Sequence, residues 1–433
     1  MVAAVELSTA QRDLFERIEL TLEHFFVTGR AGTGKSTLLA YLAEHTSKQL
    51  AICAPTGVAA LNVGGQTIHS LFRLPIGIIA DHQLPLPGDV RDLLRRLELL
   101  VVDEVSMVSA DLMDAIDRAL REARRSRLPF GGVQLVLFGD PYQLAPVPPR
   151  EPAERQYFAD HYRSLWFFDA KVWQQAPLTT VELTTIHRQR DDEFRRLLNA
   201  VRHGAVTAEI AEVLNSAGAR PVPDPRPITL AARNDEVQRI NDAALAALPG
   251  VPKTAVAEIT GDFGRTYPAD ESLRLKPGAR VMFLRNDADQ RWVNGSMGHV
   301  HSVDRSGVVV DLDDGDRVDV VPVTWEKYRY TYSAETRTLS RDVVGEFTQF
   351  PLRLAWAVTI HKSQGQTYPS AVVDLGAGAF SPGQTYVALS RIVSLEGLYL
   401  TRPLRPRDVI TDVHVERFMR EALGVHPPVA EDA

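Results

Sequence analysis

Residues 24–36 read HFFVTGRAGTGKS and decide the fold. A short β-prone run, His24–Thr28, leads into the pattern G-x-x-x-x-G-K-S at Gly29–Ser36, and helical periodicity resumes after Thr37. A strand, a glycine-rich turn and a helix in this order form a phosphate-binding loop, because successive backbone N–H groups and the helix N-terminus attract an anion. The stretch therefore predicts a nucleoside triphosphate site, and we expect ATP with Mg²⁺.

Within this loop, we expect Lys35 to reach the β- and γ-phosphates and Ser36 to ligate Mg²⁺. The predicted nucleotide contacts are Gly32, Thr33, Gly34, Lys35, Ser36 and Thr37. A dinucleotide site is excluded, because the glycines are spaced G-x-x-G-x-G and no acidic residue closes a following strand at the required distance.

Two later apolar runs end in polar side chains that suit hydrolysis. Leu99–Val102 precedes Asp103 and Glu104, which we expect at the tip of a strand beside the loop. Asp103 suits the surroundings of Mg²⁺, and Glu104 suits the base that orients or deprotonates the attacking water. Gln143 follows the third run, Gln134–Phe138, and is predicted to contact both the water and the γ-phosphate.

The order of the elements predicts an α/β fold. Apolar strands at Leu50–Ala54, Leu99–Val102 and Gln134–Phe138 are separated by helices such as residues 110–125, which is typical of a parallel sheet covered on both faces. Further along, residues 298–323 alternate as short strands, and Asp314-Gly315 predicts a two-residue hairpin between two of them.

Composition excludes several other classes of protein. No apolar run approaches the ~18 residues that a membrane span needs, and the N-terminus lacks the pattern of a signal peptide, so we expect a cytoplasmic protein. Cys53 is the only cysteine, which excludes an internal disulfide, a cysteine zinc cluster and an iron–sulfur cluster. The net charge of −7 neither indicates nor excludes nucleic-acid binding, because the local potential of a groove matters more than the total.

Several further stretches resemble, in the same order, the Pif-type (petite integration frequency) DNA helicases of superfamily one. They read APTGVAA at 54–60, GGQTIHS at 64–70, PFGGVQL at 129–135, RQ at 188–189, PLRLAWA at 351–357, HKSQGQT at 361–367 and YVALSR at 386–391. The resemblance extends from Leu7 to about Leu400. It implies two RecA-like P-loop domains that hold ATP between them while single-stranded DNA crosses their tops, with 5′→3′ translocation and unwinding of duplex or structured DNA.

The resemblance also implies a division of the chain. The first RecA-like domain is expected at residues 1–182, with a small wedge at about residues 72–96. The second is expected at residues 183–292 and 347–433, interrupted by a small all-β, SH3-like insertion at residues 293–346. Which of the two additions separates the strands of a duplex stays open. The implied protein is a compact bacterial form, monomeric and nucleoid-associated.

Further site residues follow from the resemblance. Gln11 matches the adenine-reading glutamine of the family, and Arg188 and Arg391 match its cations for the γ-phosphate. Short polar side chains and backbone N–H groups in the family's motifs predict contacts to DNA phosphates without base readout. They are Pro55, Thr56, Gly57, Thr67, His69 and Ser70 in the first domain and His361, Lys362 and Ser363 in the second.

Some alternatives remain open at this stage. His69 and His361 also suit structural roles, Trp356 suits a core position, and Tyr142 stands where the family often has phenylalanine, which leaves base stacking there in doubt. The main rival function is a DNA-stimulated ATPase that remodels nucleoprotein complexes without unwinding. A second rival is a motor directed to RNA.

Overall fold

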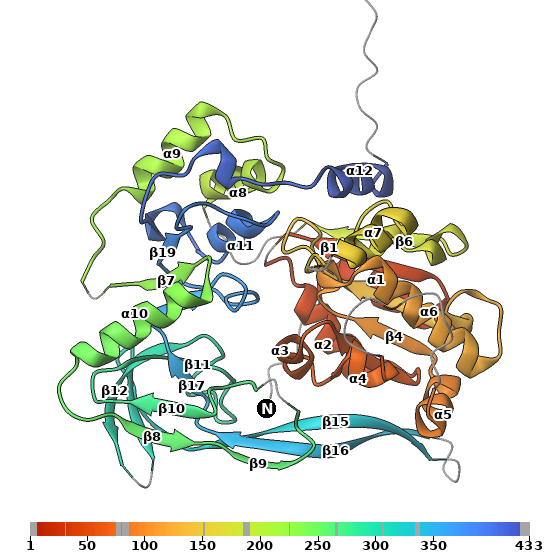
Figure 1. Cartoon of the computed structure of the whole chain (residues 1–433), viewed down its shortest axis with the longest axis horizontal. Helices are drawn as coiled ribbons and strands as arrows, with labels where there is room; N and C mark the ends of the chain where they lie inside the picture. The colour runs from red at the N-terminus through yellow and green to blue at the C-terminus, as the bar shows by residue number, and fades with distance from the viewer. Residues whose placement is uncertain are drawn as a thin grey trace, which may run out of the picture. The chain divides into compact units, whose positions relative to one another are not determined.

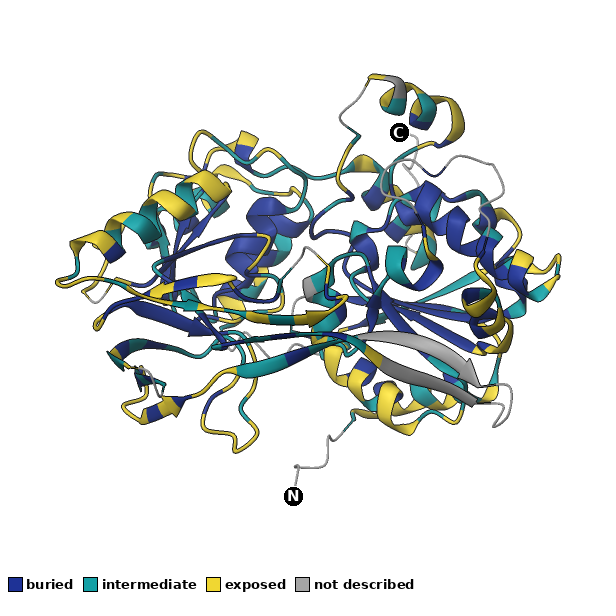
Figure 2. Ribbon diagram, turned by 60° about the horizontal axis from the view of Figure 1, so that its bottom comes forward, coloured by how far each residue is buried: buried dark blue, intermediate teal, exposed yellow. Residues whose placement is uncertain are grey.

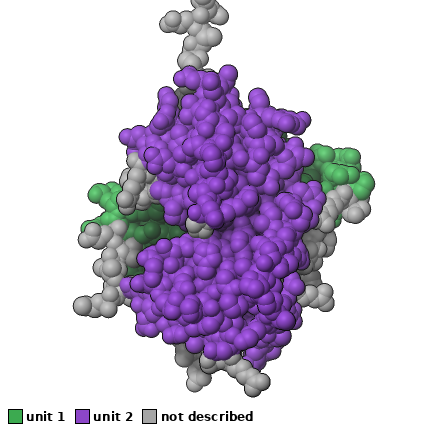
Figure 3. Space-filling model, turned by 90° about the vertical axis from the view of Figure 1, so that its left-hand side faces the viewer, with its two compact units in different colours: residues 1–187, 328–343, 412–433 green, residues 188–327, 344–411 purple. Residues whose placement is uncertain are grey.

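The computed structural model describes residues 7–30, 32–74, 79, 86–149, 152–184, 191–224, 226–264, 267–304, 307–333 and 338–424. The chain divides into two compact units (Figure 3). The first comprises residues 1–187, 328–343 and 412–433, and the second comprises residues 188–327 and 344–411. In the described part of the chain, no helix is long and apolar enough to cross a membrane.

A six-stranded sheet forms the centre of the first unit (Figure 1). Every pair of neighbouring strands in this sheet is parallel. In spatial order the strands are β3 (Gln66–Thr67), β2 (Leu50–Ala54), β4 (Leu99–Val102), β5 (Gln134–Phe138), β1 (His24–Gly29) and β6 (Leu178–Leu183).

Helices connect these strands and cover the sheet. They are α1 (Thr9–Leu20), α2 (Lys35–His45), α3 (Gly57–Asn62), α4 (Ile68–Phe72), α5 (Gly88–Arg96), α6 (Ala110–Arg124), α7 (Pro152–His161) and α12 (Val413–Ala422). Every residue of β4 and β5 is buried because both faces of these central strands are covered, whereas β6, at the edge of the sheet, is mostly half-buried. Figure 2 shows the buried ribbons in dark blue. One core cluster joins Leu14 and Ile18 of α1 to Phe25 and Val27 of β1 and to Leu38 of α2.

From the sequence we expected the strand that carries the acid pair to lie beside the phosphate loop. In the structure this strand, β4, is not a neighbour of β1, the strand that leads into the loop. β5 pairs with both β4 and β1 and separates them. Crossover connections let a parallel strand enter the sheet at a place that its position in the chain does not fix, so this part of the prediction was wrong.

The second unit contains a four-stranded parallel sheet. Its order is β18 (Ala357–Thr359), β7 (Ile228–Ala231), β19 (Ala371–Asp374) and β20 (Leu398–Leu400). The helices of this unit are α8 (Asp192–Arg202), α9 (Ala208–Gly218), α10 (Asn234–Ala247) and α11 (Gln384–Ser390). Two parallel sheets with helices confirm the predicted α/β class.

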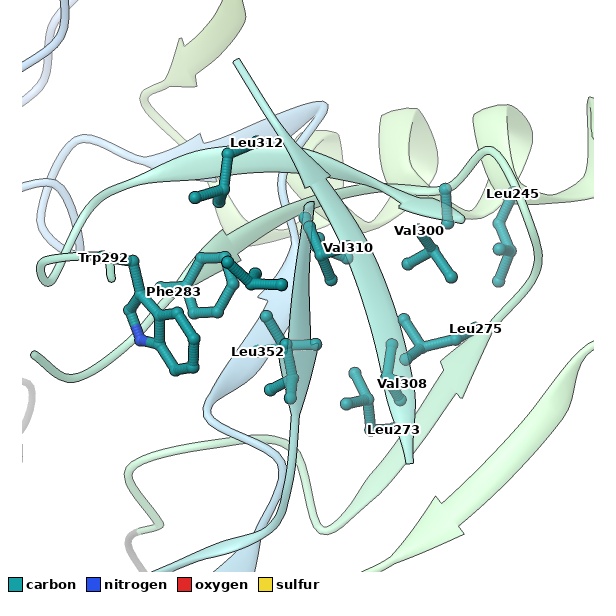
Figure 4. Close-up of a cluster of buried hydrophobic side chains, with 14 residues drawn as sticks. Leu245, Leu273, Leu275, Phe283, Trp292, Val300, Val308, Val310, Leu312 and Leu352 are labelled. Carbon is teal, nitrogen blue, oxygen red and sulfur yellow. The ribbon is translucent and has the colours of Figure 1, made fainter. Parts of the chain in front are cut away.

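The rest of the second unit is rich in antiparallel strands. A five-stranded sheet runs β14 (Arg317–Val320), β13 (Val308–Leu312), β12 (Met297–Val303), β11 (Arg280–Phe283) and β17 (Leu352–Leu354). Its buried face packs into one hydrophobic cluster that includes Phe283, Trp292 and Leu352 (Figure 4). A two-stranded sheet pairs β10 (Ser272–Leu275) with β8 (Lys253–Val256). A three-stranded sheet has the order β15 (Val323–Ser333), β16 (Thr338–Gln349) and β9 (Glu258–Gly261), and residues 328–343 of its two longer strands belong to the first unit.

Two features of this region differ from the simplest expectation. The five-stranded sheet includes β11 and β17, which lie outside residues 293–346, so the strands that pair with the predicted insertion begin earlier and end later than its bounds. The hairpin between β13 and β14 has a three-residue loop rather than a two-residue one, because the N–H of Leu312 donates to the carbonyl of Asp316. Gly315 occupies φ +100°, which suits a type I turn followed by a glycine bulge. Of the predicted wedge, residues 75–78 and 80–85 lie outside the described residues.

Candidate functional site

The candidate residues of the first unit gather at one edge of its sheet. The carboxyl ends of parallel strands meet at the same edge, where α/β proteins bind ligands. The phosphate loop follows β1, the acid pair follows β4, and Gln143 follows β5, while the segments expected to contact DNA lie at the ends of β2 and β3. In the strand order, the residues expected to bind nucleotide therefore follow β4, β5 and β1, and those expected to contact DNA follow the neighbouring β2 and β3.

The phosphate loop is held in shape by its own side chains. Lys35 Nζ donates to the carbonyl oxygens of Gly29, at 2.7 Å, and Arg30, at 3.1 Å, and Thr33 Oγ1 also donates to Arg30, at 2.9 Å. Ser36 and Thr37 are exposed in the first turn of α2. The predicted phosphate contacts Ser36 and Thr37 thus lie at the N-terminal end of α2.

Three glycines of the loop have positive φ angles, +147° at Gly29, +81° at Gly32 and +83° at Gly34. Gly29 is required for a second reason as well. A Cβ there would lie 2.4 Å from the carbonyl oxygen of Leu183 on β6 and 2.7 Å from Thr33 Oγ1. The loop can thus leave the sheet only from a glycine.

Gln11 links helix α1 to the loop. Its Oε1 accepts from the N–H of Ser8 at 2.9 Å, and its Nε2 donates to the carbonyl of Gly34 at 3.1 Å. The side chain is buried, and together with Ser8 it forms the capping box that begins α1. Gln11 therefore lies at the nucleotide loop, with its amide committed to positioning that loop in this structure.

The acid pair is unusual in two respects: the pKa of Asp103 is raised, and the backbone of Glu104 is left-handed. Burial raises the pKa of Asp103 to about 6, although the backbone N–H of Glu104 and the nearby charge of Lys35 act in the opposite direction. Burial, and then Asp103, raise the pKa of the Cys53 thiol. Glu104 itself adopts φ +50°, a left-handed conformation that is uncommon for a residue with a side chain and that concentrates at functional sites.

Gln143 is buried in the turn after β5. Its N–H donates to the carbonyl of Asp140 at 2.9 Å, and its Nε2 lies 3.4 Å from Asp140 Oδ2. Asp140 Oδ1 also accepts from the N–H of Tyr142 at 3.2 Å. Asp140, which the sequence argument did not single out, therefore shapes the turn that presents Gln143. An aspartate directly before a proline is an ordinary turn former and gave a usable indication.

The segments that follow β2 and β3 present polar groups in similar ways. Thr56 Oγ1 accepts from the N–H of Ala59, and Thr67 Oγ1 from the N–H of Ser70, both at 3.2 Å. A hydroxyl that accepts one hydrogen bond still has a proton to donate. Pro55, Gly57 and Ser70 are half-buried beside them. Burial lowers the pKa of His69, and Asp111 opposes this shift.

In the second unit, the predicted DNA segment follows β18. Burial lowers the pKa of His361. The pKa of Lys362 is also lowered, by burial and by Arg353, against the influence of Asp270. Ser363 differs from expectation, because it is fully buried and its hydroxyl donates to the carbonyl of Ile360 at 2.8 Å. Its side chain stabilises the turn and is not offered to solvent.

Of the two arginines predicted to face the γ-phosphate, the structure describes only one. Arg188 lies outside the described residues. Arg391, at the end of α11, is 1% exposed, and its guanidinium donates to the carbonyl of Val387 at 3.1 Å and to Ser390 Oγ at 2.8 Å. Its guanidinium therefore donates to residues of its own helix in this structure.

A magnesium ion fits the residues present. Among the described residues, no group of three or more histidine, cysteine, aspartate or glutamate side chains could hold a metal ion. Mg²⁺ needs no such group, since it is commonly held by one or two protein oxygens together with substrate phosphates and water. Ser36 and Asp103 supply a hydroxyl and a carboxylate of that kind.

Comparisons with known proteins agree with this geometry. The family model for the PIF1-like helicase matches residues 6–212. The ATP-dependent DNA helicase Pif1 of Bdellovibrio bacteriovorus is 33% identical, over 98% of this chain and 94% of its own length. The ATP-dependent DNA helicase PIF1 of Rattus norvegicus is 35% identical over 88% of this chain, which spans only 59% of the rat protein.

Solved structures give the same result. The crystal structure of Bacteroides sp Pif1 in complex with ADP-AlF4 has a TM-score of 0.90 and 36% identity, with 97% of each chain covered. A structure that describes two coordinating Pif1 helicases at forked double-stranded DNA has a TM-score of 0.70 and 36% identity, with 97% of this chain and 98% of that chain covered. The fold is therefore α/β with two RecA-like domains, and the chain belongs to the PIF1-like helicase family.

Proposed function

We propose that this chain couples hydrolysis of ATP to 5′→3′ movement along single-stranded DNA and to unwinding of the duplex ahead of it. Membership of the family makes it an ATP-dependent DNA helicase. One observation carries the coupling: the nucleotide residues and the polar DNA segments share one sheet edge. At its centre the N–H of Asp103, directly after β4, donates to the carbonyl of Cys53, on β2, at 2.9 Å.

The nucleotide residues have the following proposed roles. Lys35 neutralises the β- and γ-phosphates, Ser36 and Asp103 hold Mg²⁺, and Glu104 deprotonates the attacking water while Gln143 orients it. Gly32, Thr33, Gly34 and Thr37 bind the phosphates, and Gln11 lies toward the base. Mg²⁺, when bound, supplies Lewis-acid stabilisation of the phosphate charge.

Arg188 and Arg391 are proposed as the cations that neutralise charge on the γ-phosphate during hydrolysis. For Arg391, this role requires that the guanidinium exchange its bonds to Val387 and Ser390 for the phosphate. Removing such a cation costs about 10³–10⁵ in rate in related phosphoryl-transfer enzymes.

The proposed DNA contacts are nonspecific phosphate contacts. Pro55, Thr56 and Gly57 with Thr67, His69 and Ser70 form the part on the first unit, and His361 and Lys362 with the backbone at Ser363 form the part on the second. No described residue among them signals base readout, so binding should weaken with salt and tolerate any sequence. The division at residues 182–183 and the bounds of the β insertion at 293–346 also remain proposals.

Unwinding of tailed duplexes tests the function. The protein should separate a duplex with a 5′ single-stranded tail in ATP and Mg²⁺, and a duplex with a 3′ tail should remain intact. Lys35→Ala should abolish both hydrolysis and separation. DNA-stimulated hydrolysis without strand separation would instead support the remodelling ATPase, and preference for RNA tails would support an RNA motor.

We also propose that the protein acts as a monomer at the bacterial nucleoid. The solved structure described as two coordinating Pif1 helicases at forked double-stranded DNA is the relevant counter-example. Sedimentation of the protein with a forked duplex measures how many protein molecules bind one fork and so distinguishes a monomer from a pair. One protein per fork is expected, and two per fork at concentrations that support unwinding would contradict the monomer.

A further inference from the structure

The turn after β18 is tied to a loop of the antiparallel region. This strut loop, residues 284–296, connects β11 to β12. Gln366 Nε2 donates to Asn294 Oδ1 at 3.1 Å. Gly295, at φ +93°, leaves the space for this contact, since a Cβ there would lie 2.2 Å from Gln366 Oε1. The side-chain amide of Gln366 therefore lies where only a glycine admits it.

The strut loop is firmly held by its own contacts. Trp292 is 6% exposed and packs on Phe283 with ring centroids 4.5 Å apart, inside the hydrophobic cluster of the five-stranded sheet (Figure 4). Asn286 Oδ1 accepts from the N–H of Asn294 at 2.7 Å, and the N–H of Gly295 donates to the carbonyl of Phe283 at 2.9 Å. Asn294 and Gly295 thus offer Gln366 a fixed surface.

The main chain of Gln366 faces the proposed functional groups. Its N–H donates to the carbonyl of Ser363 at 3.0 Å, which closes the turn that carries His361 and Lys362. Its carbonyl lies 3.5 Å from Arg391 Nη1, and two residues on, the N–H of Tyr368 donates to the carbonyl of Arg391 at 2.8 Å. One residue therefore touches the DNA turn, the segment of the arginine and the strut loop.

We propose that Gln366 is a positioning residue that uses the strut loop to set the DNA turn and the Arg391 segment in register. The inference rests on the proposed function, because it assigns to the β insertion a part in stimulation of hydrolysis by DNA. A phosphate that binds the turn pushes against a fixed support, so the displacement is passed to Arg391 instead of being absorbed by the turn.

The first test separates positioning from general stability. Gln366→Leu and Asn294→Ala each remove the side-chain hydrogen bond, and the concentration of single-stranded DNA that half-maximally stimulates ATP hydrolysis should rise about 2- to 10-fold. The double variant should be no worse than either single variant, because both remove the same contact. Hydrolysis without DNA and the thermal unfolding midpoint should stay at the wild-type values. Asn294→Asp keeps the acceptor oxygen and should retain wild-type stimulation.

A glycine pair provides the matched control. Gly295 and Gly315 both lie in the β-rich region with φ of +93° and +100°, so alanine strains the backbone at either position. A Cβ at Gly315 would meet no described atom within 4 Å, whereas a Cβ at Gly295 would displace the amide of Gln366. Only Gly295→Ala should weaken stimulation by DNA.

Three results would overturn the inference. They are normal stimulation in Gln366→Leu and Asn294→Ala, additive losses in the double variant, or equal losses in Gly295→Ala and Gly315→Ala. Wild-type protein, measured in parallel, shows whether the proposed function fails or only the role of Gln366. If single-stranded DNA does not stimulate the wild type, the proposed function falls and this inference falls with it. If the wild type responds and the variants do too, only the role of Gln366 is lost.

Discussion

At the scale of single residues, His24 shows how the strand of the phosphate loop depends on pH. Its Nδ1 accepts from the N–H of Leu135 at 3.1 Å, and its ring packs edge-on against Phe130 and Trp173. Burial lowers the pKa of His24 to about 4 from an ordinary value of 6.5. The neutral ring is therefore the form that the folded protein holds.

The sign of the pH dependence follows from this shift. A lowered pKa in the folded state means that the unfolded chain binds the proton more tightly, so the stability from His24 is complete above pH 6.5 and is lost as pH falls to about 4. The loss amounts to about 3 kcal/mol over that window. His24→Asn keeps a hydrogen-bond acceptor but does not titrate. We therefore expect its free energy of unfolding, measured with denaturant, to lack this dependence on pH. Equal slopes for variant and wild type between pH 6.5 and 4 would contradict the assignment.

A second prediction for a single residue concerns Glu104 and its role in hydrolysis. Its carboxylate is proposed as the base, and its left-handed backbone holds the start of the short helix at Val105–Met107. Glu104→Gln keeps shape and hydrogen-bonding capacity but removes the base, so ATP and DNA should still bind while turnover falls by about 10²–10⁴. Steady-state hydrolysis at saturating DNA and binding of a fluorescent ATP analogue measure the two effects. Turnover within threefold of wild type would refute the role.

Local pattern predicts some of these residues and not others. The phosphate loop is contiguous, so its glycines and Lys35 are placed by spacing alone. The burial of Arg391 and Ser363 depends on packing between segments distant in the chain, which a motif does not encode. Gln366 and Asn294 are 72 residues apart, and only the folded sheet brings them together.

At the scale of elements, helix α6 carries three buried aspartates in addition to its buried apolar residues. Asp111, Asp114 and Asp117 are each at most 7% exposed, and each accepts hydrogen bonds from other segments. Sequence periodicity places apolar residues on a helix but cannot identify carboxylates that pair with the N–H groups of distant loops. The same limit explains the misplaced neighbour of β1, since strand order is set by crossovers rather than by chain order.

Asp114 accepts three hydrogen bonds from two other segments. It accepts from the N–H of Val172 at 3.0 Å, the N–H of Lys171 at 3.1 Å and the hydroxyl of Tyr162 at 3.0 Å. Asp114→Ala leaves all three donors without this acceptor and should lower the free energy of unfolding by about 3 kcal/mol in urea titrations. Asp92→Ala, at an exposed position of α5, provides the control, with an expected change below about 0.5 kcal/mol. Similar losses in both variants would remove the argument for a buried tether.

At the scale of the whole molecule, the last described helix belongs to the unit that the chain builds first. The sequence-based division groups it with the second domain, yet α12 packs within the first unit. Phe418 stacks on Phe168 with centroids 4.1 Å apart and also contacts Phe26 of β1, while Trp166 Nε1 donates to Asp412 at 2.8 Å. The chain therefore closes the first unit only after the second has been completed.

This closure should be measurable as a dependence of the first unit on Phe418. Phe418→Ala removes a half-buried ring from three aromatic neighbours, so the free energy of unfolding should fall by about 2 kcal/mol and binding of an apolar dye should increase as Phe26 and Phe168 become accessible. Val413→Ala, on the same helix but 76% exposed, should change neither. Hydrogen exchange locates the effect: faster exchange in β1 and α12 with unchanged protection in β7 and β19 is expected. If exchange accelerates equally in both parallel sheets, α12 does not act on the first unit alone and the argument from Phe418 fails.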